Sequence, residues 1–405
     1  MCDGWRHVAL GDLLTIDIEP VVIDPLATYQ LAGVYSFGRG LFEREQLLGA
    51  KTKYKFVHRL RQGRLVMSKL KAWEGALAVV PEAFDGFVLS PEFPTFRTHD
   101  DLDSQFLGLL CTQPSFWQML QRQSQGMGGR RERVHPRRLL EIQVLLPPLN
   151  EQKRIVDLVA AVDQCAEAVS RQRAAISNAI QSFREAVLIE LAAEPIILGD
   201  ILLGIETGKS PAAMDRLPGP DERAVLKVSA IRLGQFDPNE VKTVDPYTPL
   251  PEASRVNAGD VLMTRANTRQ LVGAVCRVMD VPDGYFLCDK TLRLIPDETR
   301  ISADFLVEVL QSAQVREQIE LAATGTSASM KNVSQASIRS LRIPLPPMEK
   351  QVNLVSILIR LRAVGVALAA ENQALSNARA EMLGSLLSGA HLIPDSYDEL
   401  LEAAG

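Results

Sequence analysis

The chain has 405 residues, of which 46% are hydrophobic, and a formal net charge of -5. Such a length allows two or three domains with hydrophobic cores. No apolar run reaches the roughly 20 residues of a membrane helix, and the N-terminus lacks a signal-peptide pattern, so we expect a cytoplasmic protein. The scattered cysteines and histidines show no C-x-x-C or H-x-x-x-H spacing, which favours buried or incidental thiols over a metal centre or a disulfide framework.

The first half of the chain, residues 1–148, has short β-rich runs broken by Pro and Gly and a helical stretch near Phe106–Gln121. It also contains two basic segments. Lys51–Trp73 has eight Lys and Arg and no acidic residue, and Arg122–Arg138 has six arginines against Glu132 alone. At physiological salt, charges that lie more than about 8 Å apart are largely screened from one another. A basic patch can therefore bind anions although the net charge of the chain is negative.

Aromatic side chains are interleaved with the first basic segment, at Tyr54, Phe56 and Trp73. This combination is typical of nucleic-acid binding, whereas a single basic run is commonly a solvated surface. The glycine-rich stretch Gly126–Gly129 would let the second segment approach a phosphate closely. We therefore predict that this half binds DNA phosphates through ten side chains: Lys51, Lys53, Lys55, Arg59, Arg61, Lys69, Lys71, Arg130, Arg131 and Arg133.

A long helix is predicted over residues 149–194. Residues from Leu149 to about Ala193 contain no Gly or Pro, and apolar residues recur at every seventh position. This regular spacing predicts a coiled coil, because two ordinary core helices would show a drifting 3.6-residue stripe. The predicted packing positions are Ile155, Val162, Val169, Ile176 and Phe183.

The second half, residues 195–347, repeats the first about 199 residues later. Val144–Gln152, with a di-proline that opens the long helix, recurs as Ile343–Gln351, and Leu10–Asp12 recurs as Leu198–Asp200. Apolar positions are kept between the copies, whereas polar positions differ. The period is too long for a solenoid, so the pattern predicts a duplicated α/β domain with an irregular, mostly antiparallel sheet.

Two polar segments of the second half are candidates for DNA contacts. Gly325–Lys331 precedes Val333 as the arginine segment of the first half precedes Val134. Arg265–Arg269 offers side chains that can pair with guanine or adenine edges, although an ordinary polar turn is the alternative interpretation. The predicted contacts of this half are Lys209, Ser210, Arg265, Asn267, Thr268, Arg269, Ser327 and Lys331.

A second long helix is predicted over residues 348–390, followed by an acidic tail, residues 391–405. A helix of about 45 residues is roughly 65 Å long, so it must project from its own domain and pack on another element. We expect the two long helices to pack antiparallel and to act as a spacer of fixed length. The packing positions of the second helix are Leu354, Leu361, Leu368, Leu375 and Met382.

Three patterns resemble catalytic motifs without meeting their requirements. Gly204–Ser210 has three residues between its glycines, where a P-loop needs four. Asp221 and Glu240–Lys242 fit a loose metal-nuclease pattern. In this chain Glu240 follows a turn-like stretch, whereas such nucleases present the glutamate and lysine from a strand. The di-prolines lack the amide and aromatic neighbours with which an adenine methyltransferase holds a flipped base, and we interpret them as helix starts.

The doubled Pro-Pro-x-x-x-Gln with its long helix resembles the DNA specificity subunit of type I restriction-modification enzymes, over residues 5–390. Two more segments match the family. These are Tyr35–Phe42 and Gly208–Pro211, where the family commonly has a Gly-x-Thr/Ser-Pro turn. A departure is Lys350, which replaces the acidic residue usual before the second glutamine.

The resemblance implies an α/β (α+β) fold in which two target-recognition domains are joined by two antiparallel coiled-coil helices as a pseudo-two-fold repeat. It implies a non-catalytic subunit of a DNA-methylation and phage-defence system, each domain reading half of a bipartite, asymmetric site in double-stranded DNA. The implied partners are two methyltransferase subunits, which carry S-adenosylmethionine, and motor-nuclease restriction subunits. The chain itself would bind neither cofactor nor metal.

Two other protein classes are alternatives. A coiled-coil scaffold or adaptor would share the helices without reading DNA, so DNA binding distinguishes it. A metal-dependent nuclease would need Asp221, Glu240 and Lys242 to converge on a cation, which cation-dependent cleavage would reveal.

Overall fold

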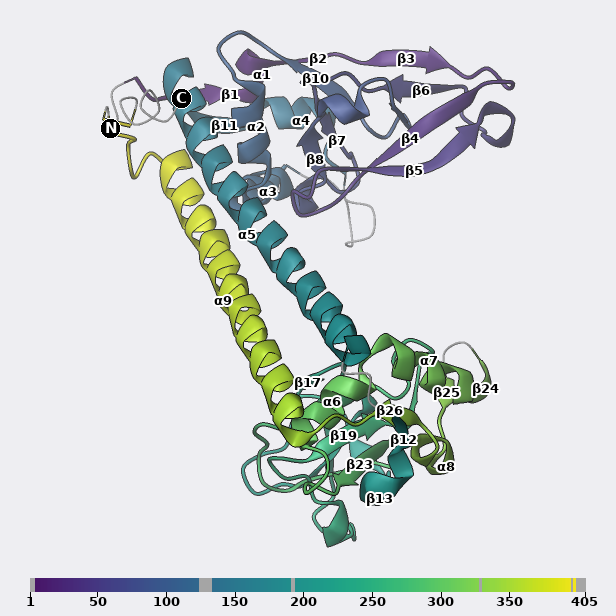
Figure 1. The fold of residues 1–405 in the computed structure, drawn as a ribbon. Helices are drawn as coiled ribbons and strands as arrows, with labels where there is room; N and C mark the ends of the chain where they lie inside the picture. The colour runs from purple at the N-terminus through teal and green to yellow at the C-terminus, as the bar shows by residue number, and fades with distance from the viewer. Residues whose placement is uncertain (1–3, 124–132, 191–193, 328–329, 395, 398–405) are drawn as a thin grey trace. The chain divides into compact units, whose positions relative to one another are not determined.

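The computed structural model describes residues 4–123, 133–190, 194–327, 330–394 and 396–397. The chain divides into two compact units: unit 1, residues 1–169 and 371–405, and unit 2, residues 170–370. Each unit combines a globular domain with one segment of each long helix, α5 (Leu149–Glu190) and α9 (Met348–Leu387) (Figure 1).

Unit 1 contains a four-stranded sheet, a five-stranded sheet and a strand pair. The first sheet has the order β2 (Leu14–Ile16), β10 (Thr95–Thr98), β7 (Leu65–Met67) and β8 (Leu77–Val79). The second has the order β3 (Glu19–Val22), β6 (Phe56–Arg59), β9 (Val88–Leu89), β4 (Thr28–Val34) and β5 (Leu41–Leu48). The remaining elements are the antiparallel pair β1 (Arg6–Ala9) and β11 (Gln143–Leu146) and the helices α1 (Leu10–Leu13), α2 (Ser104–Cys111), α3 (Pro114–Arg122) and α4 (Pro136–Leu140).

Unit 2 also contains a main four-stranded sheet, with the order β13 (Leu202–Thr207), β23 (Thr291–Pro296), β19 (Val261–Thr264) and β21 (Val275–Arg277). A second sheet has the order β14 (Ala213–Met214), β18 (Val241–Val244), β15 (Ala224–Leu226) and β22 (Tyr285–Phe286). Smaller groups are β12 (Pro195–Ile197) with β26 (Arg342–Pro344), β16 (Ile231–Arg232) with β17 (Gln235–Phe236), and β20 (Ala266–Asn267), β25 (Met330–Asn332) and β24 (Thr324–Ser327). The helices are α6 (Ala303–Leu310), α7 (Ala313–Ala322) and α8 (Gln335–Arg339).

The two units repeat one framework. The sheet β2–β10–β7–β8 corresponds strand by strand to β13–β23–β19–β21, and helices α2, α3 and α4 correspond to α6, α7 and α8. The predicted α+β fold with an internal repeat is confirmed. The second sheets differ in strand number and order, so the repeat covers the framework and not the whole of each domain.

In each framework, the first helix after the main sheet begins with a capping side chain and buries an apolar face. The Asp103 carboxylate accepts from the backbone N–H groups of Gln105 and Phe106, and α2 then buries Phe106 beside Phe96 of the sheet. In unit 2, Ser302 caps α6 through the N–H of Phe305. Such caps satisfy donors that a helix leaves without partners.

A buried glutamine joins α5 to the domain of unit 1. Gln152 Nε2 donates to the carbonyl oxygens of Asp101 (2.9 Å) and Pro147 (3.0 Å), and Gln152 Oε1 accepts from the N–H of Asp103 (2.8 Å). The side chain is 0% exposed. One amide group thus connects the start of α5, the di-proline and the loop before α2.

Gln351 makes the same three hydrogen bonds in unit 2. Its Nε2 donates to the carbonyl oxygens of Arg300 (3.0 Å) and Pro346 (2.8 Å), and its Oε1 accepts from the N–H of Ser302 (2.9 Å). It is also 0% exposed. Each of these residues lies 199 positions after its counterpart around Gln152, so the repeat in sequence is a repeat of geometry.

Both long helices start directly after a di-proline. The carbonyl oxygen of Pro148 accepts from the N–H of Gln152 (3.0 Å), and that of Pro347 accepts from the N–H of Gln351 (3.2 Å). The second proline of each pair therefore occupies the cap position, where its missing N–H has no consequence. An acidic residue lies in the first turn of each helix, as the helix dipole favours.

The helix segments are antiparallel within each unit. In unit 1, Asp163 of α5 pairs with Arg379 of α9 (Oδ2–Nη2 2.9 Å). Ile155, which precedes Asp163 in α5, shares a core with Leu386, which follows Arg379 in α9. In unit 2, Gly365 lies against Ile176, whereas Leu188 shares a core with Leu354. All ten predicted packing positions are buried or half-buried: Ile155, Val162, Val169, Ile176, Phe183, Leu354, Leu361, Leu368, Leu375 and Met382.

Unit 2 contains a buried ion-pair group at the helices. Glu308 of α6, 2% exposed, accepts from Arg184 Nε of α5 (3.0 Å) and from Arg362 Nη2 of α9 (2.9 Å). One carboxylate therefore ties α6 to both helix segments. Unit 1 has Leu109 and Leu383 at the positions equivalent to Glu308 and Arg184, so the same ion-pair group cannot form there.

Helix α9 is long and apolar enough to cross a membrane when judged by length and composition alone. Its apolar part contains Arg360 and Arg362, and Arg362 pairs with Glu308. Apolar helices of this kind also occur in protein cores. The cytoplasmic location stays a prediction.

Replacing Gln152 by leucine is expected to lower the free energy of unfolding of unit 1 by about 3 kcal/mol, because the substitution leaves one N–H and two carbonyl groups buried without a partner. Urea unfolding followed by circular dichroism measures the loss. Gln164→Leu, at an exposed position of α5, is the control. Equal unfolding midpoints for the two variants would contradict a structural role of the Gln152 amide.

Candidate nucleic-acid interface

Three segments of unit 1 meet around Lys69. Its N–H donates to the carbonyl oxygen of Glu92 (3.1 Å), its Nζ donates to that of Pro91 (2.9 Å), and its own carbonyl oxygen accepts from the N–H of Val134 (2.9 Å). The guanidinium of Arg133 lies 3.4 Å from the Glu92 carboxylate. Two cations from separate basic segments of the sequence are therefore neighbours in the fold.

A short turn carries the next cation. Lys71 Nζ lies 5.6 Å from the centre of the Trp73 ring and 2.6 Å from a carboxylate oxygen of Glu74. Trp73 is held by its indole N–H, which donates to the carbonyl oxygen of Leu70 (3.1 Å). The other predicted cations of this region, Arg130 and Arg131, lie outside the described residues.

The loop between β4 and β5, residues 35–40, docks on this turn. The N–H of Phe37 donates to the carbonyl oxygen of Glu74 (2.7 Å), and that of Gly38 donates to the carbonyl oxygen of Gly75 (3.0 Å). Phe37 has a φ of 64°, a left-handed conformation that costs a bulky residue about 1–3 kcal/mol. The loop thus adds to the surface around Lys69 and Lys71.

The other cations of the first basic segment fall into two groups. Lys51, Lys53 and Lys55 are exposed. Arg61 donates two hydrogen bonds to the Glu19 carboxylate (2.7 and 2.8 Å), and Arg59 lies 3.4 Å from the same carboxylate. The hydrogen bond from Arg61 lowers the pKa of Glu19, so these two arginines already have an anionic partner within the unit.

In unit 2, the predicted segments also meet. The N–H of Val333 donates to the carbonyl oxygen of Arg265 (2.9 Å), as that of Val134 donates to Lys69, which confirms the predicted equivalence of Val333 and Val134. Asn267 of β20 is paired with Lys331 of β25, whose Nζ donates to the carbonyl oxygen of Gly325 (2.6 Å).

The neighbouring predicted residues of unit 2 have partners of their own. The Asn267 side chain accepts from the N–H of Thr268 (2.8 Å), and Arg269 lies 3.3 Å from the Glu320 carboxylate. Ser327 is in β24. The assignment of all these side chains to DNA contacts stays a prediction.

The turn of residues 208–211 packs on the segment before β23. The N–H of Gly208 donates to the carbonyl oxygen of Cys288 (3.2 Å), and a Cβ at Gly208 would overlap the carbonyl oxygen of Leu287, so a glycine is required there. The exposed Lys209 follows, and the Ser210 hydroxyl donates to Asp289. The predicted pair is thus held rigidly by the backbone approach at Gly208.

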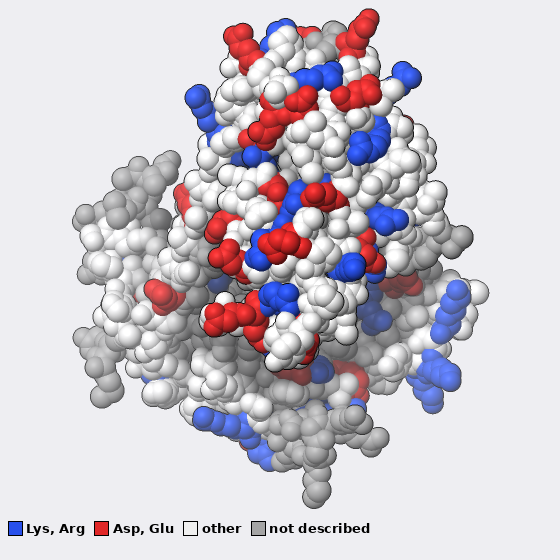
Figure 2. All heavy atoms as spheres, turned by 90° about the horizontal axis from the view of Figure 1, so that it is seen from below, with Lys and Arg blue, Asp and Glu red and all other residues white. Residues whose placement is uncertain are grey.

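A cavity of about 490 Å³ lies beside this turn and is lined by Lys227, Lys242 and Lys290. Lys227 pairs with Asp215 (2.5 Å), and this hydrogen bond lowers the pKa of Asp215. Sequence reasoning did not identify these lysines as a group, because they come from three distant segments. On the face drawn in Figure 2, by contrast, basic and acidic side chains are interspersed.

The residues of the nuclease-like pattern have other roles in the fold. Glu240 accepts from the Ser229 hydroxyl (2.6 Å), and Lys242 lines the cavity beside residues 208–211. Among the described residues, no group of three or more His, Cys, Asp or Glu side chains could hold a metal ion. Burial raises the pKa of the Cys276 thiol to about 12, which is the behaviour of a core side chain.

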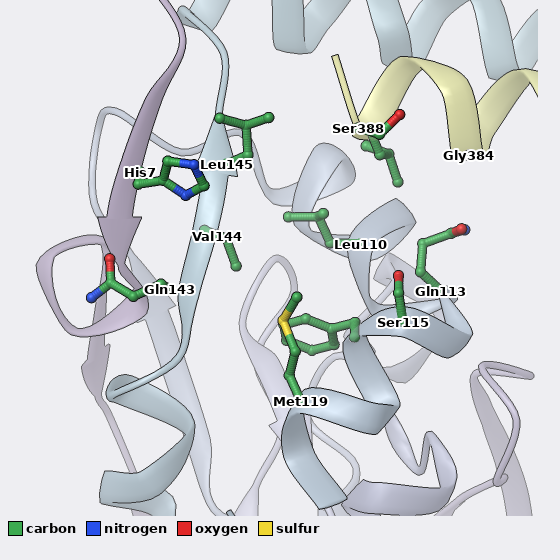
Figure 3. A pocket seen from close by; sticks show the side chains of 12 residues that line it. His7, Leu110, Gln113, Ser115, Met119, Gln143, Val144, Leu145, Gly384 and Ser388 are labelled. Carbon is green, nitrogen blue, oxygen red and sulfur yellow. The ribbon is translucent and has the colours of Figure 1, made fainter. Parts of the chain in front are cut away.

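A second cavity, of about 280 Å³, lies in unit 1 between β11, α3 and the end of α9 (Figure 3). Its lining is largely apolar and includes Leu110, Met119 and Leu145, with His7 and Ser388 at its edge. Gly384 contributes no side chain to it.

In unit 2, a longer polar side chain replaces Gly384. The equivalent residue, Glu185, accepts from the N–H of Ala313 at the start of α7 (2.8 Å). Unit 1 has Pro114 at the position of Ala313, and a proline has no N–H to bind such a carboxylate. Gly384 and Pro114 therefore cannot make in unit 1 the contact that Glu185 and Ala313 make in unit 2.

The family profile described as "Type I restriction modification DNA specificity domain" matches residues 3–178 and 219–375. The chain belongs to this family. The chain is 33% identical, over 164 residues, to the type I restriction enzyme EcoEI specificity subunit of Escherichia coli. This match covers 39% of the chain and 27% of that relative. The chain is 22% identical, over 236 residues, to the EcoKI specificity subunit of E. coli strain K12, covering 53% of this chain and 49% of that relative. The aligned regions thus span less than half of each curated relative.

Two solved structures share the fold of this chain. The HsdS subunit from Thermoanaerobacter tengcongensis has a TM-score of 0.51 at 19% identity, and the match covers 96% of this chain and 98% of that one. A chain from a study titled "Structural basis underlying complex assembly and conformational transition of the type I R-M system" has a TM-score of 0.60 at 20% identity, with 95% and 98% covered.

Replacing Lys51, Lys53 and Lys55 together by alanine is expected to weaken binding to all DNA sequences alike. Each lost phosphate contact should reduce the slope of log affinity against log salt concentration by about 0.9. Fluorescence anisotropy over a salt series, with a specific and a random duplex, measures both effects. Lys153→Ala, at an exposed position of α5, is the matched control, and an unchanged slope in the triple variant would remove these lysines from the interface.

Proposed function

We propose that this protein is the DNA-recognition subunit of a type I restriction-modification complex. Each unit reads one half of a bipartite, asymmetric site in double-stranded DNA, and the subunit itself is not catalytic. The observation that carries the proposal is the repeat: two frameworks with the same glutamine contacts present different polar surfaces. The equal frameworks attach each domain to the start of its own helix in the same way. The different polar surfaces would then read different DNA sequences.

The chemistry of methylation and restriction belongs to partner subunits in this proposal. Methyltransferase subunits, two per chain, supply S-adenosylmethionine and modify the site, and motor-nuclease subunits join them for restriction. The long helices are the docking surface. Their ends are fixed to the domains by Gln152 and Gln351, so a partner bound to a helix has a defined position relative to the DNA-reading surface of the same unit.

The outer face of α9 supports a docking role. Between residues 352 and 370 the exposed side chains are almost all apolar, and Val366 is 70% exposed. Arg360 is the charged residue among the exposed ones in this stretch. An apolar surface of this kind on a soluble protein marks an interaction site. The equivalent stretch of α5 has charged residues such as Lys153 and Glu167 in place of Val352 and Val366.

Lengthening the two helices together tests the spacer part of the proposal. One heptad inserted between Val169 and Ile176, and one between Leu368 and Leu375, should preserve the apolar seam and lengthen each helix by about 10 Å at 1.5 Å per residue. This corresponds to about three base pairs. Long-read mapping of adenine methylation in cells should show one bipartite motif for the wild-type complex and the same half-sites with a wider gap for the variant.

The matched control is a single insertion, between Val169 and Ile176 alone, which should misalign the helices and impair folding. A folded double variant that methylated the original gap would refute the spacer mechanism. Absence of any bipartite methylated motif with the wild-type complex, expressed with its methyltransferase partner, would refute the proposed function itself.

Ile359→Glu is expected to weaken the association with the methyltransferase partner by about 2 kcal/mol, roughly thirtyfold, because it places a charge in the apolar face of α9. Sedimentation velocity of the mixed subunits measures the loss. The control is Ala160→Glu, the equivalent position of α5, where charged neighbours already surround the site. A larger effect of the control would show that the partner does not depend on the apolar face.

A further inference from the structure

Phe37 is the one non-glycine residue with a positive φ in the part of the chain that the structure describes. Its backbone is fixed there by two hydrogen bonds, from its own N–H to Glu74 (2.7 Å) and from Gly38 to Gly75 (3.0 Å). Glycine would adopt this conformation without strain, whereas phenylalanine is disfavoured. The presence of a large ring at this position therefore needs an explanation other than the course of the backbone.

The ring is not part of a core. Phe37 is 61% exposed, and one side of it rests on Trp117 in an edge-to-face contact with ring centres 6.2 Å apart. Trp117 is itself anchored, because its indole N–H donates to the carbonyl oxygen of Cys111 (2.7 Å). The exposed ring is thus held up by a fixed aromatic support.

The loop beneath the ring is tightly packed. A Cβ at Gly38 would lie 2.9 Å from the Cα of Thr112, and a Cβ at Gly75 would lie 2.5 Å from a ring carbon of Trp117. Both glycines also have positive φ angles. These close approaches restrict the backbone of the loop that carries Phe37.

The loop of Phe37 and the turn that binds it both carry a cation. The guanidinium carbon of Arg39 lies 4.7 Å from the centre of the Tyr35 ring, and Arg39 Nε donates to the carbonyl oxygen of Ser36 (3.0 Å). The turn that holds the loop carries Lys71. Lys71 also pairs with Glu74 (2.6 Å). An exposed aromatic ring on a loop that carries Arg39, two residues further along, fits DNA, which offers both bases and phosphates, better than it fits an apolar protein surface.

We propose that Phe37 is a wedge that enters the base stack of the half-site bound by unit 1 and stacks on a base there. The inference rests on the proposed function and adds a specificity-determining contact to it. Apolar side chains inserted at a base step partly unstack it, and sequence then matters through the cost of opening that step. A base that is to be methylated must also leave the stack, so an opened step assists the partner enzyme.

The test uses the complex with its methyltransferase partner and duplexes that contain the methylated site, with 2-aminopurine scanned through the half-site of unit 1. Wild-type complex should raise the fluorescence at one step. Phe37→Gly should fold with undiminished thermal stability, because glycine relieves the strained φ, yet lose the signal and bind about 5- to 150-fold more weakly, the range for loss of one base–aromatic stack.

Two further measurements separate stacking from other roles. Phe37→Trp should retain the signal, and an abasic nucleotide at the opened step should weaken binding of the wild type but not of Phe37→Gly, because the variant has no ring to stack on the missing base. Leu26→Ala, which truncates another exposed apolar side chain of unit 1, should change neither readout. These results would be expected from a wedge and not from a purely structural residue.

The outcomes that overturn the inference are distinct from failure of the proposed function. If the wild-type complex is selective for the site and Phe37→Gly binds it equally well, the wedge is wrong and the function stands. If Phe37→Gly loses association with the methyltransferase instead of DNA affinity, the ring contacts protein and the wedge is wrong. If the wild-type complex selects no duplex, the proposed function fails and the inference fails with it.

Discussion

The buried amide of Gln152, and of Gln351 in the repeat, is the contact on which the architecture depends. Each side chain fixes the first turn of a helix of about forty residues to the loop before α2 or α6. Successive residues of a helix are about 100° apart around its axis, so a shift of one residue at the start would turn the whole apolar seam away from its partner. A contact made at one end of the helix therefore sets the orientation of every packing position along it.

The elements that follow from local sequence were predictable. Each di-proline and the glutamine after it mark a helix start, and the heptad spacing of residues such as Val162 and Leu361 marks the seam, because both signals lie within a few turns of one helix. The polar contacts between elements were not predictable. Glu308 binds arginines from two different helices, and Arg61 is occupied by Glu19 across a sheet, so neither pairing has a local signature.

The same distinction applies to the candidate interface. Basic composition indicated the segments of Lys69 and Arg133, and the fold brings them together through Val134 and Glu92. The exposure of Phe37 had no such signal, since an aromatic residue between Ser36 and Gly38 is as compatible with a core as with a surface. The backbone hydrogen bonds of the loop fix its course, and the exposed surface of Phe37 shows that the ring is not buried.

The two units show what duplication leaves free to change. The glutamine contacts keep their geometry in both units, whereas the outer faces of the two long helices differ. Helix α9 has an apolar outer face where α5 has charges, so a single type of partner subunit would meet two chemically different surfaces on one chain. Binding to the apolar face would strengthen with the apolar area that the partner covers and would depend little on salt concentration. Binding to the charged face would weaken as salt screens its charges. If both helices dock such a subunit, as proposed, this difference predicts unequal partner affinities, and hence an ordered assembly, without any difference between the partner subunits themselves.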